Sequence, residues 1–210
     1  RSRGQAAPTA KLSAWDSHKG LGVEMRSNRS LASLTASTSL LEFFGFSHMV
    51  LLPSIARDVL GVDAAGLGLL FGLRNLGGFV GSIFLATLGD RPVKGLLYQV
   101  SILVFGGLLL LLSVSNQFGV VVLLLVSLSA MMALTSVLSQ SIMQLVVPNE
   151  LRGRAMGAWQ LAIGTSPAGS VQIGALASLA GMTVAISLNG FGLVLLAVGL
   201  AVFAPSMRRT

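Results

Sequence analysis

Six long apolar segments, separated by short polar stretches, place the strongest constraint on the fold of this chain. They cover residues 32–55, 66–88, 96–113, 119–147, 155–180 and 183–204. A helix that crosses a bilayer needs about 20 apolar residues, and every segment is near or above that length. Backbone polar groups must be satisfied internally in lipid, so we expect each segment to be helical. The sequence therefore predicts an all-α integral membrane protein with six transmembrane helices.

The composition excludes a soluble enzyme. Only 10% of the 210 residues are charged and 53% are hydrophobic, whereas a soluble domain carries about 25% charged residues. A soluble core of this size cannot hide so much apolar surface. The chain has no cysteine, so disulfides and thiolate chemistry are absent. The net charge of +7 does not predict a nucleic-acid partner, because basic residues also gather on the cytoplasmic side of membrane proteins.

The positions of the charges predict the topology. Of the 21 charged side chains, only Glu42 and Arg74 lie within the apolar segments. Six crossings place 12 of the 14 basic residues on the side of both termini, and leave only Arg57 on the other. By the positive-inside rule both termini are cytoplasmic, in a multi-pass protein of the cell membrane. We expect a basic linker or tail at 1–31, a membrane domain at 32–204 and a short cytoplasmic tail at 205–210.

Small residues predict where helices approach closely or break. Gly68 and Gly72, and then Gly77 and Gly81, are each four residues apart, which places both members of a pair on one helix face. The fifth segment contains Gly-Thr-Ser-Pro-Ala-Gly at 164–169. Proline removes a helical hydrogen-bond donor, so we expect a kink or break there. A tight turn is expected at Gly181-Met182, between the fifth and sixth segments.

Charges inside a membrane are costly, which makes Glu42 and Arg74 the first candidates for a cavity that binds substrate or protons. Glu42 shares a helix face with Thr35, Thr38 and Ser39, and Asn75 adjoins Arg74. The structural alternative is that Glu42 and Arg74 simply neutralise each other between adjacent helices.

Further polar residues extend this list of candidates. Ser136 and Gln140 lie on one face of the fourth segment with two methionines, which suits a cavity wall or plain helix–helix bonding. His48 is a cavity candidate too, although it lies about 120° round the helix from Glu42. A hydrogen-bonded structural role is the alternative for this histidine.

Enzyme chemistry finds no support in the sequence. Gly45-Phe46-Ser47-His48 is superficially similar to the serine motif of intramembrane proteases, but His48 adjoins Ser47 and the only other histidine, His18, lies in the N-terminal tail. No nucleophile–base dyad can form from these residues. No cluster has metal-ligand spacing and no phosphate-binding loop is present. We expect no enzymatic activity, no metal and no cofactor.

Two loops carry a resemblance to a known family. They are Leu88-Gly89-Asp90-Arg91-Pro92-Val93-Lys94 and Pro148-Asn149-Glu150-Leu151-Arg152-Gly153-Arg154-Ala155-Met156-Gly157. With Leu52-Pro53 and the stretch 56–61, they resemble the C-terminal six-helix half of major facilitator superfamily transporters, closest to bacterial drug and siderophore exporters of the enterobactin-exporter and macrolide-efflux type. The Asp90-Arg91 loop is a degenerate copy of the superfamily's Gly-x-Leu-x-Asp-Arg loop, with Ala86 in place of the leading glycine.

The resemblance implies a cytoplasmic charge network that latches helix ends in one access state. Its members are Asp90, Arg91, Glu150, Arg152 and Arg154. Simple positive-inside anchoring is the alternative role for these charges.

The resemblance also implies secondary active transport around a midplane site, here the proton-coupled export of an amphipathic small molecule such as a drug or siderophore. The partners are then substrate, protons, the lipid bilayer and either an N-terminal six-helix half or a second copy. Residues 1–31 would link this half to the first, or Met25 would start a short protein. Uptake, or a non-transporting six-helix scaffold, is the alternative function.

Overall fold

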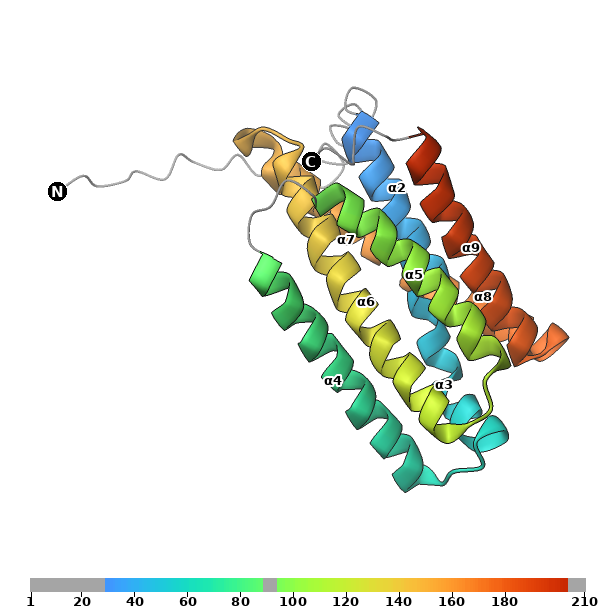
Figure 1. Ribbon diagram of the computed structural model, residues 1–210. Coiled ribbons are helices and arrows are strands. Elements are labelled where there is room, and N and C mark those ends of the chain that lie inside the picture. Colours follow the sequence, from blue (N-terminus) through green and yellow to red (C-terminus); the bar gives the residue numbers. More distant parts are fainter. Residues whose placement is uncertain (1–28, 89–93, 204–210) are drawn as a thin grey trace, which may run out of the picture.

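The computed structural model describes residues 29–88 and 94–203, which form a single helical bundle (Figure 1). The elements, in chain order, are α2 (Arg29–Phe44), η1 (Phe46–Leu51), α3 (Leu52–Ser54), η2 (Ile55–Val59), α4 (Ala64–Leu88), α5 (Lys94–Val114), α6 (Phe118–Leu145), η3 (Asn149–Leu151), α7 (Arg152–Ile163), α8 (Ser166–Ala180) and α9 (Met182–Phe203). The long helices run alternately up and down, so α2 begins and α9 ends at the same end of the bundle.

Five helices in the described part are long and apolar enough to cross a membrane. They are Ser30–Val59, Ala64–Thr87, Lys94–Val114, Phe118–Leu145 and Met182–Val202. The first is a composite of α2 and the three short elements that follow it, where the helix tightens into a six-residue 3₁₀ segment, η1. The prediction of an all-α, multi-pass membrane protein is therefore confirmed. Five of the six predicted segments coincide with candidate spans, and the count of six crossings stays a prediction.

The fifth apolar segment is broken, as its glycines and proline predict. It forms α7, of 12 residues, and α8, of 15 residues, separated at Gly164-Thr165. Pro167 lies in the first turn of α8, where its missing N–H costs nothing. The Thr165 hydroxyl donates to the carbonyl of Ser39 at 2.9 Å and fixes the break against α2. Each piece is too short to cross a bilayer alone.

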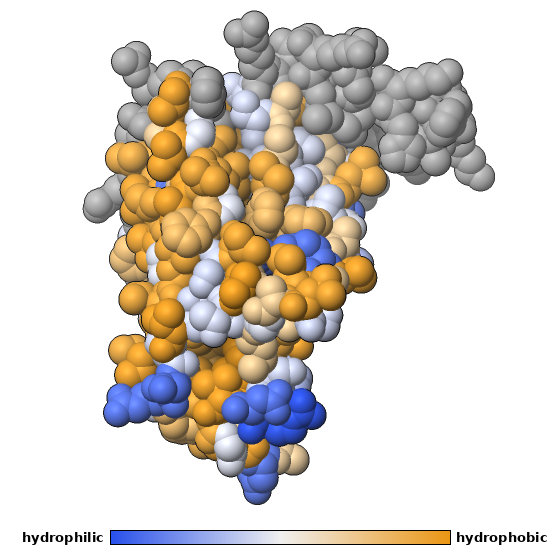
Figure 2. Space-filling view, turned by 90° about the vertical axis from the view of Figure 1, so that its right-hand side faces the viewer, coloured by the Kyte–Doolittle hydropathy of each residue, from blue (hydrophilic) through white to orange (hydrophobic). Residues whose placement is uncertain are grey.

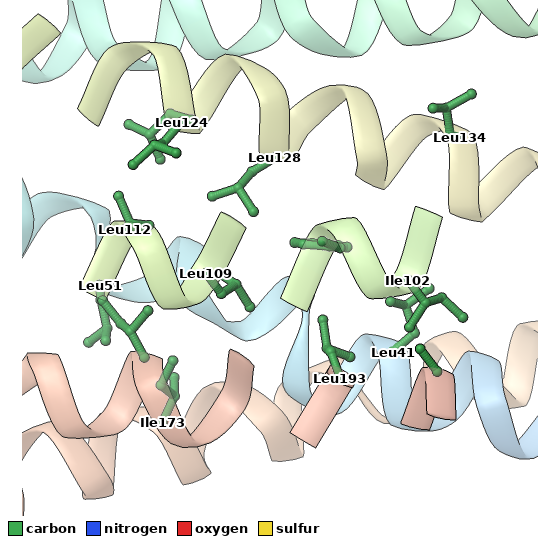
Figure 3. Close-up of a cluster of buried hydrophobic side chains, with 14 of the residues drawn as sticks. Leu41, Leu51, Ile102, Leu109, Leu112, Leu124, Leu128, Leu134, Ile173 and Leu193 are labelled. Carbon is green, nitrogen blue, oxygen red and sulfur yellow. The ribbon is translucent and has the colours of Figure 1, made fainter. Parts of the chain in front are cut away.

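Leucine and other apolar side chains fill the interior, and apolar side chains also cover the outside. Figure 3 shows Leu109 of α5, Leu128 of α6 and Leu193 of α9 within one buried cluster. Figure 2 shows apolar residues over most of the height of the surface, with hydrophilic residues at the lower end and in a smaller patch at mid-height. Lipid is as apolar as this core, so close packing and polar contacts have to specify the helix pairs.

Glycines provide two of the closest helix contacts. A Cβ at Gly77 or Gly81 would collide with the backbone of α6 at Val126 or Ala130. Likewise, a Cβ at Gly169 of α8 would collide with the backbone of α2 at Phe43. The second predicted pair on α4 therefore packs as expected.

Gly68 and Gly72, the first predicted pair, do not pack in this way. A Cβ at either position would have no neighbour within 4 Å, so their spacing does not produce a helix contact among the described residues. The tight turn between the last two segments is present, because Gly181 has a φ of 89° between the end of α8 and the start of α9.

Candidate functional site

Glu42 lies in the membrane-spanning part of α2 and is 6% exposed. The hydroxyl of Ser166, the first residue of α8, is its hydrogen-bond partner. The break in the fifth segment therefore has two contacts with one region of α2, through Thr165 to Ser39 and through Ser166 to Glu42. The carboxyl group of Glu42 therefore lies beside the break between α7 and α8.

Arg74 extends from α4 toward two other elements and is 8% exposed. Its guanidinium donates to the sulfur of Met49 in η1 at 3.2 Å and to the sulfur of Met132 in α6 at 3.6 Å. A third contact, of 3.4 Å, reaches the side-chain oxygen of Asn75. The buried Nε has no acceptor. Arg74 thus joins three elements through acceptors that are unusually weak for a cation.

Glu42 and Arg74 do not form an ion pair with each other. The carboxyl group has Ser166 as its partner, and the guanidinium has two methionines and an asparagine. The structure therefore contradicts the structural alternative, in which Glu42 and Arg74 neutralise each other. Two ionisable groups within membrane-spanning helices are left with separate surroundings.

The other cavity candidates lie in different positions. Ser136 and Gln140 are half-buried on α6. Neither forms a hydrogen bond to the side chain of Glu42 or Arg74. Asn75 is exposed, and its amide oxygen accepts a hydrogen bond from Arg74. Among these three candidates, only Asn75 forms a hydrogen bond with Glu42 or Arg74.

His48 is almost completely buried in η1. Its Nδ1–H donates to the carbonyl of Gly45, and its ring packs edge-on against Phe105 with centroids 6.0 Å apart. These contacts give it the structural role that was one of its two interpretations. Its Nε2 atom has no partner.

Sequence reasoning missed a chain of polar side chains that joins η1, α8 and α9. Gln172 donates to the side-chain oxygen of Asn189 at 3.1 Å, and Asn189 donates to the hydroxyl of Ser47 at 2.8 Å. Asn189 is completely buried. The available signal was a single amide in the middle of a strongly apolar segment, which has to find a partner in lipid.

The proposed charge network falls mostly outside the described residues. Asp90 and Arg91 lie there, as does the side chain of Glu150. Arg152 and Arg154 are exposed in the first turn of α7, at the end of the bundle where α2 begins. The latch therefore stays a prediction. Within residues 29–88 and 94–203, no group of three metal-ligating side chains comes together.

Comparison with known proteins adds one finding. The sequence model of a major facilitator family, described as transmembrane secretion effector, matches residues 21–210. No curated protein and no solved structure matches the chain.

Proposed function

Since the chain belongs to the transmembrane secretion effector family of the major facilitator superfamily, we propose that it exports an amphipathic small molecule in exchange for protons. Family membership makes it a multi-pass membrane transporter. The direction of transport, the coupling ion and a drug-like or siderophore-like substrate are parts of the proposal. The resemblance of its loops to drug and siderophore exporters supports them.

The observation that carries the proposal is the separate placement of Glu42 and Arg74. Ionisable residues inside a membrane are rare and mark substrate or proton pathways. A simple structural pair would have its charges in contact, whereas Glu42 is paired with a hydroxyl and Arg74 with thioethers. We assign proton exchange to Glu42, because a carboxyl group beside a neutral hydroxyl can release and accept a proton without breaking an ion pair.

The proposal treats the chain as the C-terminal half of a twelve-helix transporter in the cell membrane. The sixth crossing is then the broken pair α7 and α8, and both termini are cytoplasmic. A discontinuous helix beside the substrate site is common in transporters, because unwound backbone is tolerated where it lines a cavity. Asp90, Arg91, Glu150, Arg152 and Arg154 would act as the cytoplasmic latch between access states.

Everted membrane vesicles that contain the complete protein test the exchange. Respiration acidifies the vesicle interior, and a pH-sensitive acridine dye reports the loss of that gradient. We expect a dye recovery when erythromycin, a catecholate siderophore or ethidium is added, because the entering substrate releases a proton. Glu42→Gln should remove this recovery at an equal level of protein in the membrane.

Asp58→Asn is the matched control. Asp58 is an exposed carboxylate that pairs with Arg57 at 2.6 Å outside the proposed cavity, so its loss should leave the recovery intact. Equal recovery in Glu42→Gln and in the unaltered protein would refute the role of Glu42. No recovery with any of the three compounds in the unaltered protein would refute proton-coupled export of this substrate class.

A further inference from the structure

Arg74 has more hydrogen-bond donors than the surrounding protein satisfies. A guanidinium presents five N–H donors, and its strongest partners are carboxylates and phosphates. Here the acceptors are two thioether sulfurs and one amide oxygen at 3.4 Å. Thioethers are weak acceptors, and the Nε–H has none at all although it is buried. Arg74 is only 8% exposed, so its guanidinium has fewer and weaker hydrogen-bond acceptors than a buried cation requires.

The three acidic residues whose side chains the structure describes all have other partners. Glu42 is the partner of Ser166. Asp58 binds Arg57 through both carboxylate oxygens, and Asp63 accepts from the backbone N–H of Gly66 at 2.9 Å. The counter-charge for Arg74 therefore does not come from any acid that the structure describes.

The depth of Arg74 in the membrane argues against a lipid headgroup as its partner. It follows Ala64, the first residue of α4, by ten positions, so it lies about 15 Å along the helix axis at 1.5 Å per residue. This is about half of the thickness of a bilayer core, which is ~30 Å. A headgroup anchored at the surface cannot reach that level without leaving its own interface.

The surroundings of the guanidinium fit the apolar body of a ligand better than a small hydrated ion. Met49 and Met132 contact it from two different elements. Methionine is flexible and polarisable, and it adapts to irregular apolar shapes. The Nε2 atom of His48, in the same η1 element as Met49, is buried and has no partner. The guanidinium of Arg74 is therefore a hydrogen-bond donor surrounded by flexible apolar side chains.

We propose that the guanidinium of Arg74, which contacts η1 and α6 from its place on α4, binds the carboxylate of an amphipathic anion. The planar guanidinium holds the carboxylate through two parallel hydrogen bonds, and the two methionines contact the adjoining apolar chain. This inference rests on the proposed function, whose substrate it narrows to an amphipathic organic acid. Glu42 and Arg74 then have different tasks, with the proton at the first and the anionic substrate at the second.

Equilibrium binding to the complete protein tests the proposal without requiring transport. The protein is placed in nanodiscs of phosphatidylcholine, which carries no net charge, and titrated with dansyl-aminoundecanoic acid and with its uncharged carboxamide. We expect the acid to bind about 30-fold more tightly, equivalent to ~2 kcal/mol, the low end for loss of one member of a buried charge pair. Arg74→Gln should remove this difference.

Two further variants separate recognition from folding. Arg74→Lys keeps the charge but loses the fork, so it should retain a reduced preference for the acid. Arg57→Gln removes an exposed arginine whose side chain is 77% accessible, and it should leave the preference unchanged. A preference that survives in Arg74→Gln would overturn the proposal, and so would equal binding of acid and carboxamide to the unaltered protein.

A lipid competition identifies the source of the anion. A comparison of the nanodisc and vesicle results then separates this proposal from the transport proposal. Displacement of the bound acid by added phosphatidylglycerol would overturn a free organic acid in favour of a lipid headgroup. An Arg74-dependent preference in nanodiscs, together with no proton exchange when dansyl-aminoundecanoic acid is added to the vesicles, would leave the anion site standing and refute the exporter. Proton exchange in vesicles without a preference for the acid in nanodiscs would support the exporter and refute the anion site.

Discussion

The contact between α4 and α6 allows a sharp test of how backbone packing holds this bundle together. A Cβ added at Gly81 would lie 2.7 Å from the carbonyl oxygen of Ala130 and 2.9 Å from its Cα. Ordinary contact begins at 3.4 Å, so the helices would have to separate by about 0.7 Å at this point. Both partners are backbone atoms, which cannot move away by a change of rotamer. Overpacking of this kind costs about 1–3 kcal/mol.

Gly72→Ala is the matched control, because it makes the same chemical change on the same helix. No atom lies within 4 Å of a Cβ at Gly72. Alanine is favoured over glycine in a helix by about 0.5–1 kcal/mol. We therefore expect Gly81→Ala to destabilise the protein and Gly72→Ala to stabilise it slightly.

Thermal unfolding of the purified protein in detergent, followed by size-exclusion chromatography after heating, measures both changes. At roughly 2–4 °C per kcal/mol for a chain of this size, the melting temperature should fall by about 2–12 °C in Gly81→Ala. In Gly72→Ala it should be unchanged or higher. Equal shifts in the two variants would refute the view that α4 and α6 are held by backbone proximity at Gly81.

Three further predictions concern other parts of the molecule. A double-mutant cycle with Asn189→Ala and Ser47→Ala should give a coupling energy of about 0.6–1.7 kcal/mol, the range of hydrogen bonds between membrane helices, and additive effects would contradict the direct bond. In the cysteine-free chain, Asn116→Cys and Thr183→Cys should react with an impermeant maleimide in intact cells, and Arg152→Cys only after permeabilisation. Protection of the cysteine at 183 would show that α7 and α8 do not cross. Arg152→Gln should lower transport at an unchanged membrane level, and equal transport would exclude the latch.

The fold followed from the sequence wherever length and apolar composition decide the structure. Five spans coincide with predicted segments because an uninterrupted apolar stretch of this length has no alternative to a helix in lipid. The break at Gly164-Thr165 was predictable for a local reason, because Pro167 cannot donate the next helical hydrogen bond. The contact that fixes this break against α2, from Thr165 to Ser39, is not contained in any local pattern.

Contacts between helices were much less predictable. The spacing of Gly68 and Gly72 is the same as that of Gly77 and Gly81, yet only the second pair contacts another backbone. Which face of α4 meets α6 depends on the rest of the bundle. The partners of Arg74 also come from η1 and α6, far away along the chain. For the site, the sequence supplied the unusual residues, and the fold determined that Glu42 and Arg74 stay apart.

The position of α4 in the bundle has a consequence for how the protein is made. Its main contact is with α6, which begins at Phe118, so the whole of α5 has to be synthesised first. During translation, Gly77 and Gly81 of α4 therefore have no helix to pack against until α6 has been made. The α4 helix must therefore insert on its own hydropathy while carrying Arg74, whose insertion costs about 2.5–3.5 kcal/mol at a helix centre. Truncated nascent chains that end within α5 would show whether lipid alone retains this helix.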